Sequence, residues 1–230
     1  MFPTTRWTLI LASQKKGEGA ERAALEQLCA TYWKPVYFFL RRKGLAPEAA
    51  EDAVQGFFLH LLEREFLGRL DPARGRFRSY LLRALEHYLV NLHERDTALK
   101  RGGAFRFVPL DLVLAERELP AAPEPPLQAY EREWAVGLME RALGRLRQEY
   151  EEGRRKGRGE TVLGFFTLER APSYAEAAEA CGMTVPQFKA ALHRARARFR
   201  EILRSEVAAT VEDDGEADQE IGDLMRALSS

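Results

Sequence analysis

The sequence predicts an all-α protein with two helical domains, a proline-rich linker between them and an acidic tail. Apolar residues recur at the three- and four-residue spacing of amphipathic helices through most of the 230-residue chain. Prolines cluster between Gly102 and Leu127, where that spacing is lost. Residues 206–230 carry one basic and eight acidic residues. The predicted divisions are domains at 1–101 and 130–205, a linker at 102–129 and a C-terminal extension at 206–230.

Composition and charge exclude several classes of protein. No apolar run is long enough to cross a bilayer, and the short apolar stretch after Arg6 lacks the cleavage site of a signal peptide. Two distant cysteines, Cys29 and Cys181, are typical of a protein from the reducing cytosol. We therefore expect a cytoplasmic protein with no membrane partner.

The formal net charge of +0 conceals an uneven distribution. Residues 1–108 have a net charge of +6 and residues 172–205 a net charge of +3, whereas residues 206–230 have a net charge of −7. Such asymmetry indicates an electrostatic partner.

The first predicted domain contains four helices. We expect them at 4–13, 20–43, 48–65 and 77–99, with a kink or break at Pro35 and a loop at 70–76. The third helix has an apolar stripe that includes Phe58, and an opposite face on which Asp52, Gln55 and Leu59 fall together. That face is either a surface that another helix approaches or a solvated face with one stray leucine.

The helix at 77–99 carries a polar stripe opposite its apolar one. Its members are Tyr80, Arg83, His87, Asn91 and Arg95, with Arg76 and Arg78 at one end, whereas Phe77 belongs to the apolar stripe. An aromatic ring among cations and an amide suits single-stranded DNA, because bases stack on the ring and cations hold phosphates. The alternative is a solvated helix face with a half-buried tyrosine.

The second predicted domain ends in two helices joined by a sharp turn. Helices at 130–152 and 161–168 precede a capping box at Ser173 and a second one at Thr184, with Gly182 between them. The second helix becomes strongly basic from His193 on. This is the pattern of a DNA-binding helix-turn-helix, and the alternative is an αα-hairpin with a solvated basic face.

Motifs of catalysis are not recognisable in the sequence. His87 and His93 are six residues apart, which does not put two metal ligands on one helix face, and neither a nucleophile elbow nor a dinucleotide fingerprint is present. We expect no catalytic residues, no metal, no cofactor and no enzymatic activity.

Taken together, the chain resembles bacterial RNA polymerase sigma factors of the extracytoplasmic-function type. The stretch from Ala50 to Leu59 (AEDAVQGFFL) is similar to a conserved helix of the family's region two. The stretch from Gly75 to Asn91 resembles its promoter-melting helix, and Lys189 with the run from Leu192 to Arg196 resembles the recognition helix of region four.

This resemblance implies a role for each candidate surface. The residues expected to bind core RNA polymerase are Asp52, Gln55, Phe58 and Leu59. Those expected at the −10 element of promoter DNA are Arg76, Phe77, Arg78, Tyr80, Arg83, His87, Asn91 and Arg95. Those expected at the −35 element are Thr184, Val185, Lys189, Ala190, His193, Arg194, Arg196 and Arg198.

The sequence is compatible with three interpretations of function. The main one is a sigma factor that directs transcription initiation, and the second is a stand-alone helix-turn-helix regulator of duplex DNA. A third is an adaptor whose basic helices bind an acidic protein. The acidic tail either solubilises the protein or folds over a basic face and restrains it, in place of a separate anti-sigma factor.

Overall fold

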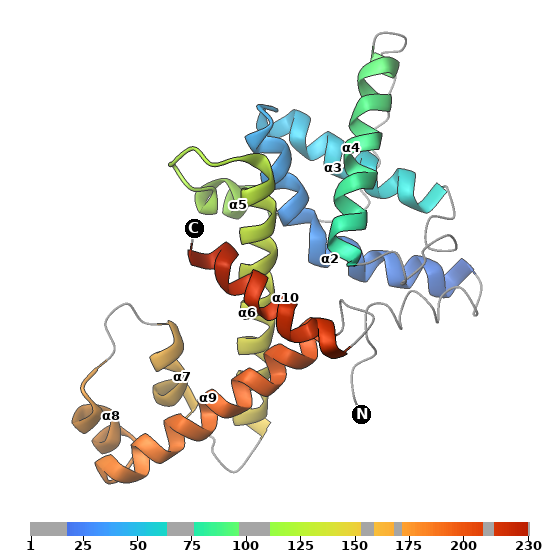
Figure 1. The fold of residues 1–230 in the computed structure, drawn as a ribbon. Helices are drawn as coiled ribbons and strands as arrows, with labels where there is room; N and C mark the ends of the chain where they lie inside the picture. The colour runs from blue at the N-terminus through green and yellow to red at the C-terminus, as the bar shows by residue number, and fades with distance from the viewer. Residues whose placement is uncertain are drawn as a thin grey trace. The chain divides into compact units, whose positions relative to one another are not determined.

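The computed structural model describes residues 18–63, 76–96, 111–152, 159–167, 172–208 and 214–229, and over these ranges the chain is all-α, without strands (Figure 1). The helices are α2 (Glu18–Arg42), α3 (Pro47–Glu63), α4 (Phe77–Asp96), α5 (Leu112–Glu118), α6 (Pro126–Glu152), α7 (Gly159–Thr167), α8 (Tyr174–Ala180), α9 (Val185–Ala208) and α10 (Asp214–Ser229). The all-α prediction is confirmed for this part of the chain. The helix predicted at 4–13 and nearly all of the loop predicted at 70–76 lie outside the described residues.

The chain divides into two compact units. Met1–Gly137 and Val207–Ser230 form the first, and Leu138–Glu206 form the second. Within the described ranges, none of the helices has both the length and the apolar character that crossing a membrane requires.

The core of the first unit is built from aromatic and aliphatic side chains of α2, α3 and α4. Tyr32 of α2 packs edge-on against Phe77 of α4, with ring centroids 5.3 Å apart. Phe57 of α3 contacts Tyr88 of α4 at 5.7 Å. Helix α2 runs across Pro35 without the break that was one of the two expected outcomes.

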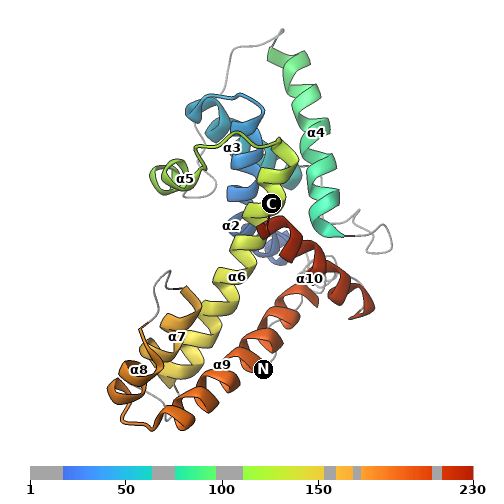
Figure 2. The same cartoon turned by 60° about the vertical axis from the view of Figure 1, so that its left-hand side comes forward.

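A glycine sets the distance between α3 and α4. A Cβ atom on Gly56 would lie 2.3 Å from the hydroxyl oxygen of Tyr88, so only glycine lets the tyrosine lie where it does. Beyond this contact the second half of α4 extends away from the other helices of the unit, as Figures 1 and 2 both show. This leaves Val90 60% exposed.

The predicted linker contains a helix of its own. Helix α5 begins after Asp111, whose side chain accepts a hydrogen bond from the Leu114 amide at 3.0 Å. Glu116 of α5 accepts hydrogen bonds from Tyr37 and from Arg41 Nε, both at 2.7 Å. These contacts attach residues 111–118 to α2, within the stretch where a linker was expected.

The second unit contains two helices joined by a sharp turn at the place where the sequence predicts a helix-turn-helix. Ser173 and Glu176 form a complete capping box at the start of α8, and Gln187 accepts from the Thr184 amide at 2.9 Å at the start of α9. Gly182 in the turn has a φ of +61°, a conformation that favours glycine. Phe188 is fully buried, with its ring 5.3 Å from that of Phe165.

Candidate nucleic-acid interface

The outward face of α4 gathers four of the predicted DNA-binding residues. Tyr80, Arg83, His87 and Asn91 follow one another at helical spacing, and the last three are exposed while Tyr80 is half-buried. The opposite side of the helix, with Leu81 and Leu85, is buried in the core. Arg95 belongs to the same helix, but its side chain lies outside the described part of the structure.

The beginning of α4 differs from the rest of the helix. Phe77 is a core residue, and Arg78 is only 6% exposed, with its guanidinium 4.5 Å from the centre of the Trp134 ring. The carbonyl of Arg78 accepts a hydrogen bond from the Tyr130 hydroxyl at 3.1 Å. Neither Phe77 nor Arg78 therefore faces solvent beside Arg83, although both were expected at the DNA surface.

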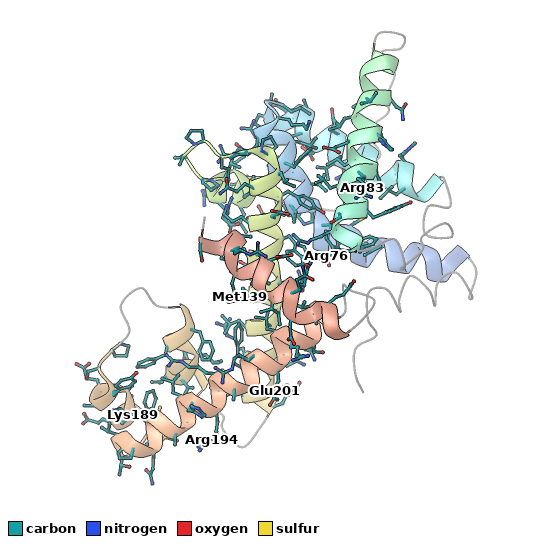
Figure 3. All side chains as sticks on the ribbon, viewed as in Figure 1. Arg76, Arg83, Met139, Lys189, Arg194 and Glu201 are labelled. Atoms are coloured by element: carbon teal, nitrogen blue, oxygen red, sulfur yellow. The ribbon has the colours of Figure 1, made fainter. Side chains whose placement is uncertain are left out.

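Two carboxylates of α10 lie against the arginines that begin α4. Glu220 is fully buried, and its carboxylate is 2.7 Å from Arg76 Nη1 and 2.8 Å from Arg78 Nε. Asp223, one helical turn further on, pairs with Arg76 and lies 3.6 Å from Arg78 Nη2. Figure 3 shows Arg76 beside α10 and Arg83 further along α4.

The pKa values of these two carboxyl groups move in opposite directions. Burial raises the pKa of Glu220, and the charges of Arg78 and Arg76 offset only part of that rise. Burial also acts to raise the pKa of Asp223, but the hydrogen bond from Arg76 and the neighbouring positive charges hold it below its usual range. Of the two carboxylates, Glu220 is therefore the one whose loss of hydration is less fully offset by the neighbouring arginines.

On α3, three of the four residues predicted to bind polymerase lie at the surface. Asp52 is exposed, and Gln55 and Leu59 are half-buried at positions that share a face with it. Phe58 is 1% exposed and packs on Phe57, with ring centroids 5.3 Å apart. Phe58 is therefore a core residue, and of the four predicted residues only Asp52, Gln55 and Leu59 lie where a partner protein can contact them.

The outward face of α9 carries the residues predicted to contact duplex DNA. Exposed side chains are Thr184, Lys189, Ala190, His193, Arg194 and Arg196, while Val185 is half-buried. The ammonium of Lys189 lies 5.1 Å from the centre of the Tyr174 ring, which fixes it near the start of the helix. Figure 3 labels Lys189 and Arg194 on α9.

Arg198 is engaged by carboxylates within the second unit. Its Nη2 and Nε lie 2.7 and 2.9 Å from the two carboxylate oxygens of Glu149 on α6, and its Nη1 lies 2.8 Å from Glu201. The hydrogen bonds from Arg198 lower the pKa of Glu149. A bidentate pair of this kind makes Arg198 a bridge between α6 and α9, so it is less available to phosphate than Arg194.

The individual ion pairs of α10 with Arg76 and Arg78 were not predicted from the sequence. The signals in the sequence were the concentration of acidic residues in the tail and its amphipathic end from Ile221 to Leu228, and neither identifies a partner for any one carboxylate. Within the described ranges, no three His, Cys, Asp or Glu side chains lie close enough together to hold a metal ion.

The chemistry of both outward faces is that of anion binding. Helix α4 combines a tyrosine ring with a guanidinium, an imidazole and an amide, which can stack on a base and contact phosphates. Helix α9 presents cations along a regular helix of a size that enters a major groove. A comparison with family models, with curated proteins and with solved structures finds no match for this chain.

Proposed function

We propose that this protein is a promoter-specificity subunit of bacterial RNA polymerase. The exposed face of α3 binds core polymerase through Asp52, Gln55 and Leu59. The outward face of α4 holds the single strand of the −10 element as it opens, and α9 enters the major groove at the −35 element. The protein has no catalytic role of its own and works in the cytoplasm.

The observation that carries this proposal is the presence of two cationic faces with different chemistry. A stand-alone regulator needs only the face of α9, whose cations line a helix after a sharp turn. It has no evident use for Tyr80, Arg83 and Asn91 on one side of a helix that extends away from its unit. That arrangement suits a strand whose bases are unpaired.

The proposal also assigns the two compact units. The first unit is the region two-like domain, which holds polymerase and melted DNA, and the second unit contains the region four-like helix-turn-helix. The chain passes from the first unit to the second within α6, between Gly137 and Leu138. On this assignment the beginning of α6 belongs with the first domain, since Trp134 and Tyr130 pack on Arg78.

The decisive experiment combines copurification with core polymerase and run-off transcription on a library of promoters. Leu59→Asp places a charge on the α3 face and is expected to abolish copurification while leaving duplex binding intact. Arg83→Ala is expected to leave copurification intact and to reduce open-complex formation. Arg117→Ala, which removes an exposed cation from α5, is the matched control. Failure of the unaltered protein to copurify with core polymerase would refute the proposal.

A second candidate function is a stand-alone regulator that binds duplex DNA. The observation that favours it is that the helix-turn-helix is complete within the second unit, from the capping box at Ser173 to the buried Phe188. This candidate predicts duplex binding with the same affinity in the presence and absence of core polymerase. Leu59→Asp and Arg83→Ala would then have no effect on transcription.

A further inference from the structure

At the start of α4, two predicted DNA-binding cations are paired with anions of the same unit, as Arg198 is in the second unit. Arg76 and Arg78 are paired with Glu220 and Asp223 of α10, whereas Arg83 further along the helix is exposed. Since Glu220 and Asp223 are three residues apart, both carboxylates lie on one face of α10. They neutralise the same guanidinium groups that phosphates of a nucleic-acid strand would contact on the proposed function.

Charge contributes much of what holds α10 in place. Among its described side chains, Ala217 and Leu224 are fully buried and Ile221 is half-buried, whereas Met225 is 53% exposed and Leu228 lies at the surface. The buried Glu220 loses its hydration shell on docking, and this cost offsets part of its attraction to the arginines. A helix held partly by ion pairs can be displaced by a strand that supplies other anions.

We infer that α10 is an intramolecular competitor of nucleic acid, which keeps Arg76 and Arg78 from single-stranded DNA until a strand displaces it. The inference rests on the proposed function of the α4 face. It adds a regulatory role for the acidic tail that acts through two named carboxylates. The opposing reading is that α10 is a permanent part of the core of the first unit, in which case DNA binding leaves it in place.

The first experiment measures binding of the full chain to a fluorescent single-stranded 12-nucleotide oligonucleotide at several salt concentrations. The variants are Asp223→Asn and the double variant Glu220→Gln with Asp223→Asn. Asp218→Asn is the matched control, because it removes the same charge from an exposed position of the same helix. Circular dichroism verifies that each variant keeps its helical content.

The double variant is expected to bind about tenfold more tightly than the unaltered chain, and the control to bind like the unaltered chain. If two further phosphates are contacted, the slope of log affinity against log salt becomes steeper by about 1.4, at roughly 0.7 for each phosphate of a single strand. Binding by the unaltered chain with no change in the variants would overturn the inference alone. Absence of binding by every variant, even at low salt, would overturn the proposed function as well.

The second experiment uses the unaltered chain and therefore does not depend on how a variant folds. Hydrogen exchange is followed with and without the oligonucleotide, and the backbone amides of α10 are compared with those of α2. Displacement predicts faster exchange throughout α10 when the oligonucleotide is bound, with α2 unchanged. Bound oligonucleotide with unchanged or slower exchange in α10 would show that the helix stays docked and would overturn the inference.

Discussion

Replacement of Gly56 by alanine tests the close approach of α3 and α4, on which the positions of both proposed surfaces of the first unit depend. The new Cβ would lie 2.3 Å from the Tyr88 hydroxyl oxygen and 3.5 Å from Cζ. The oxygen must therefore move by about 1 Å to reach ordinary van der Waals contact. The tyrosine ring lies near the rings of Phe57 and His60, at 5.7 and 5.4 Å, which restrict that movement.

The expected magnitude follows from two opposing contributions. Crowding in a packed site costs about 1–3 kcal/mol, while alanine in place of glycine inside a helix gains about 1 kcal/mol. Gly56→Ala should therefore lower the free energy of unfolding by about 1 kcal/mol. In a Tyr88→Phe background the crowded oxygen is gone, so the same replacement should raise stability by about 1 kcal/mol.

Chemical denaturation of the four members of this double-mutant cycle measures a coupling energy, expected to be about 2 kcal/mol. The cycle subtracts the intrinsic cost of losing the Tyr88 hydroxyl. Gly144→Ala is the control, because a Cβ there meets nothing within 4 Å and should only stabilise α6. A coupling energy below about 0.5 kcal/mol would refute the claim that Tyr88 requires a glycine opposite it.

Three further predictions concern single residues of the two units. Arg194→Ala should make the slope of log duplex affinity against log salt shallower by about 0.9. Arg198→Ala, which loses its pair with Glu149, should change that slope less and should lower the free energy of unfolding by less than about 1 kcal/mol. Equal slopes for the two variants would contradict the proposal that Arg194 contacts phosphate and Arg198 does not. The hydrogen bond from Arg41 holds the pKa of Glu116 below its usual range. The Glu116 carboxylate therefore stabilises the folded protein at any pH above the pKa of an unfolded glutamate, and this stabilisation is lost as the pH falls through the lower pKa of the folded state. Thermal unfolding between neutral and acid pH should accordingly depend less on pH in Glu116→Gln, and an unchanged dependence would count against the pair. Burial raises the pKa of the Cys29 thiol, so maleimide should label Cys29 only as fast as the chain unfolds, and fast labelling of the folded chain would be inconsistent with this packing.

The features that could be predicted from the sequence are those fixed by near neighbours in the chain. The turn before α9 is an example, because Thr184 and Gln187 cap each other and Gly182 supplies the positive φ. The buried position of Phe188 follows from its place on the apolar stripe of α9. Such signals need no knowledge of the rest of the fold.

Features fixed by distant residues could not be predicted in this way. Helix α5 lies in a stretch whose prolines indicated a linker, and it is attached by Glu116 to Tyr37 and Arg41, more than seventy residues earlier. Arg78 shows the same limit at a candidate surface. Its motif assigned it to the DNA surface, yet its packing on Trp134 of α6 puts it inside. The burial of Phe58, by contrast, agrees with the apolar stripe of its helix and not with the surface role that the family motif implied.

The sequence places positive charge at the start of α4 with no acidic residue in its first turn, and the tail supplies acidic residues. The N-terminal end of a helix carries partial positive charge, so cations there are unfavourable and anions are favoured. Helix α4 nevertheless starts with Arg76 just before it and Arg78 in its first turn, and it has no acidic residue in that turn. Anions from elsewhere in the chain therefore stabilise this end of α4, and in the structure they come from Glu220 and Asp223 of α10 and from Glu131 of α6. A phosphate of a nucleic-acid strand has the same sign of charge. The competition that we propose would therefore follow from the charge of α4 itself and would need no special property of the tail.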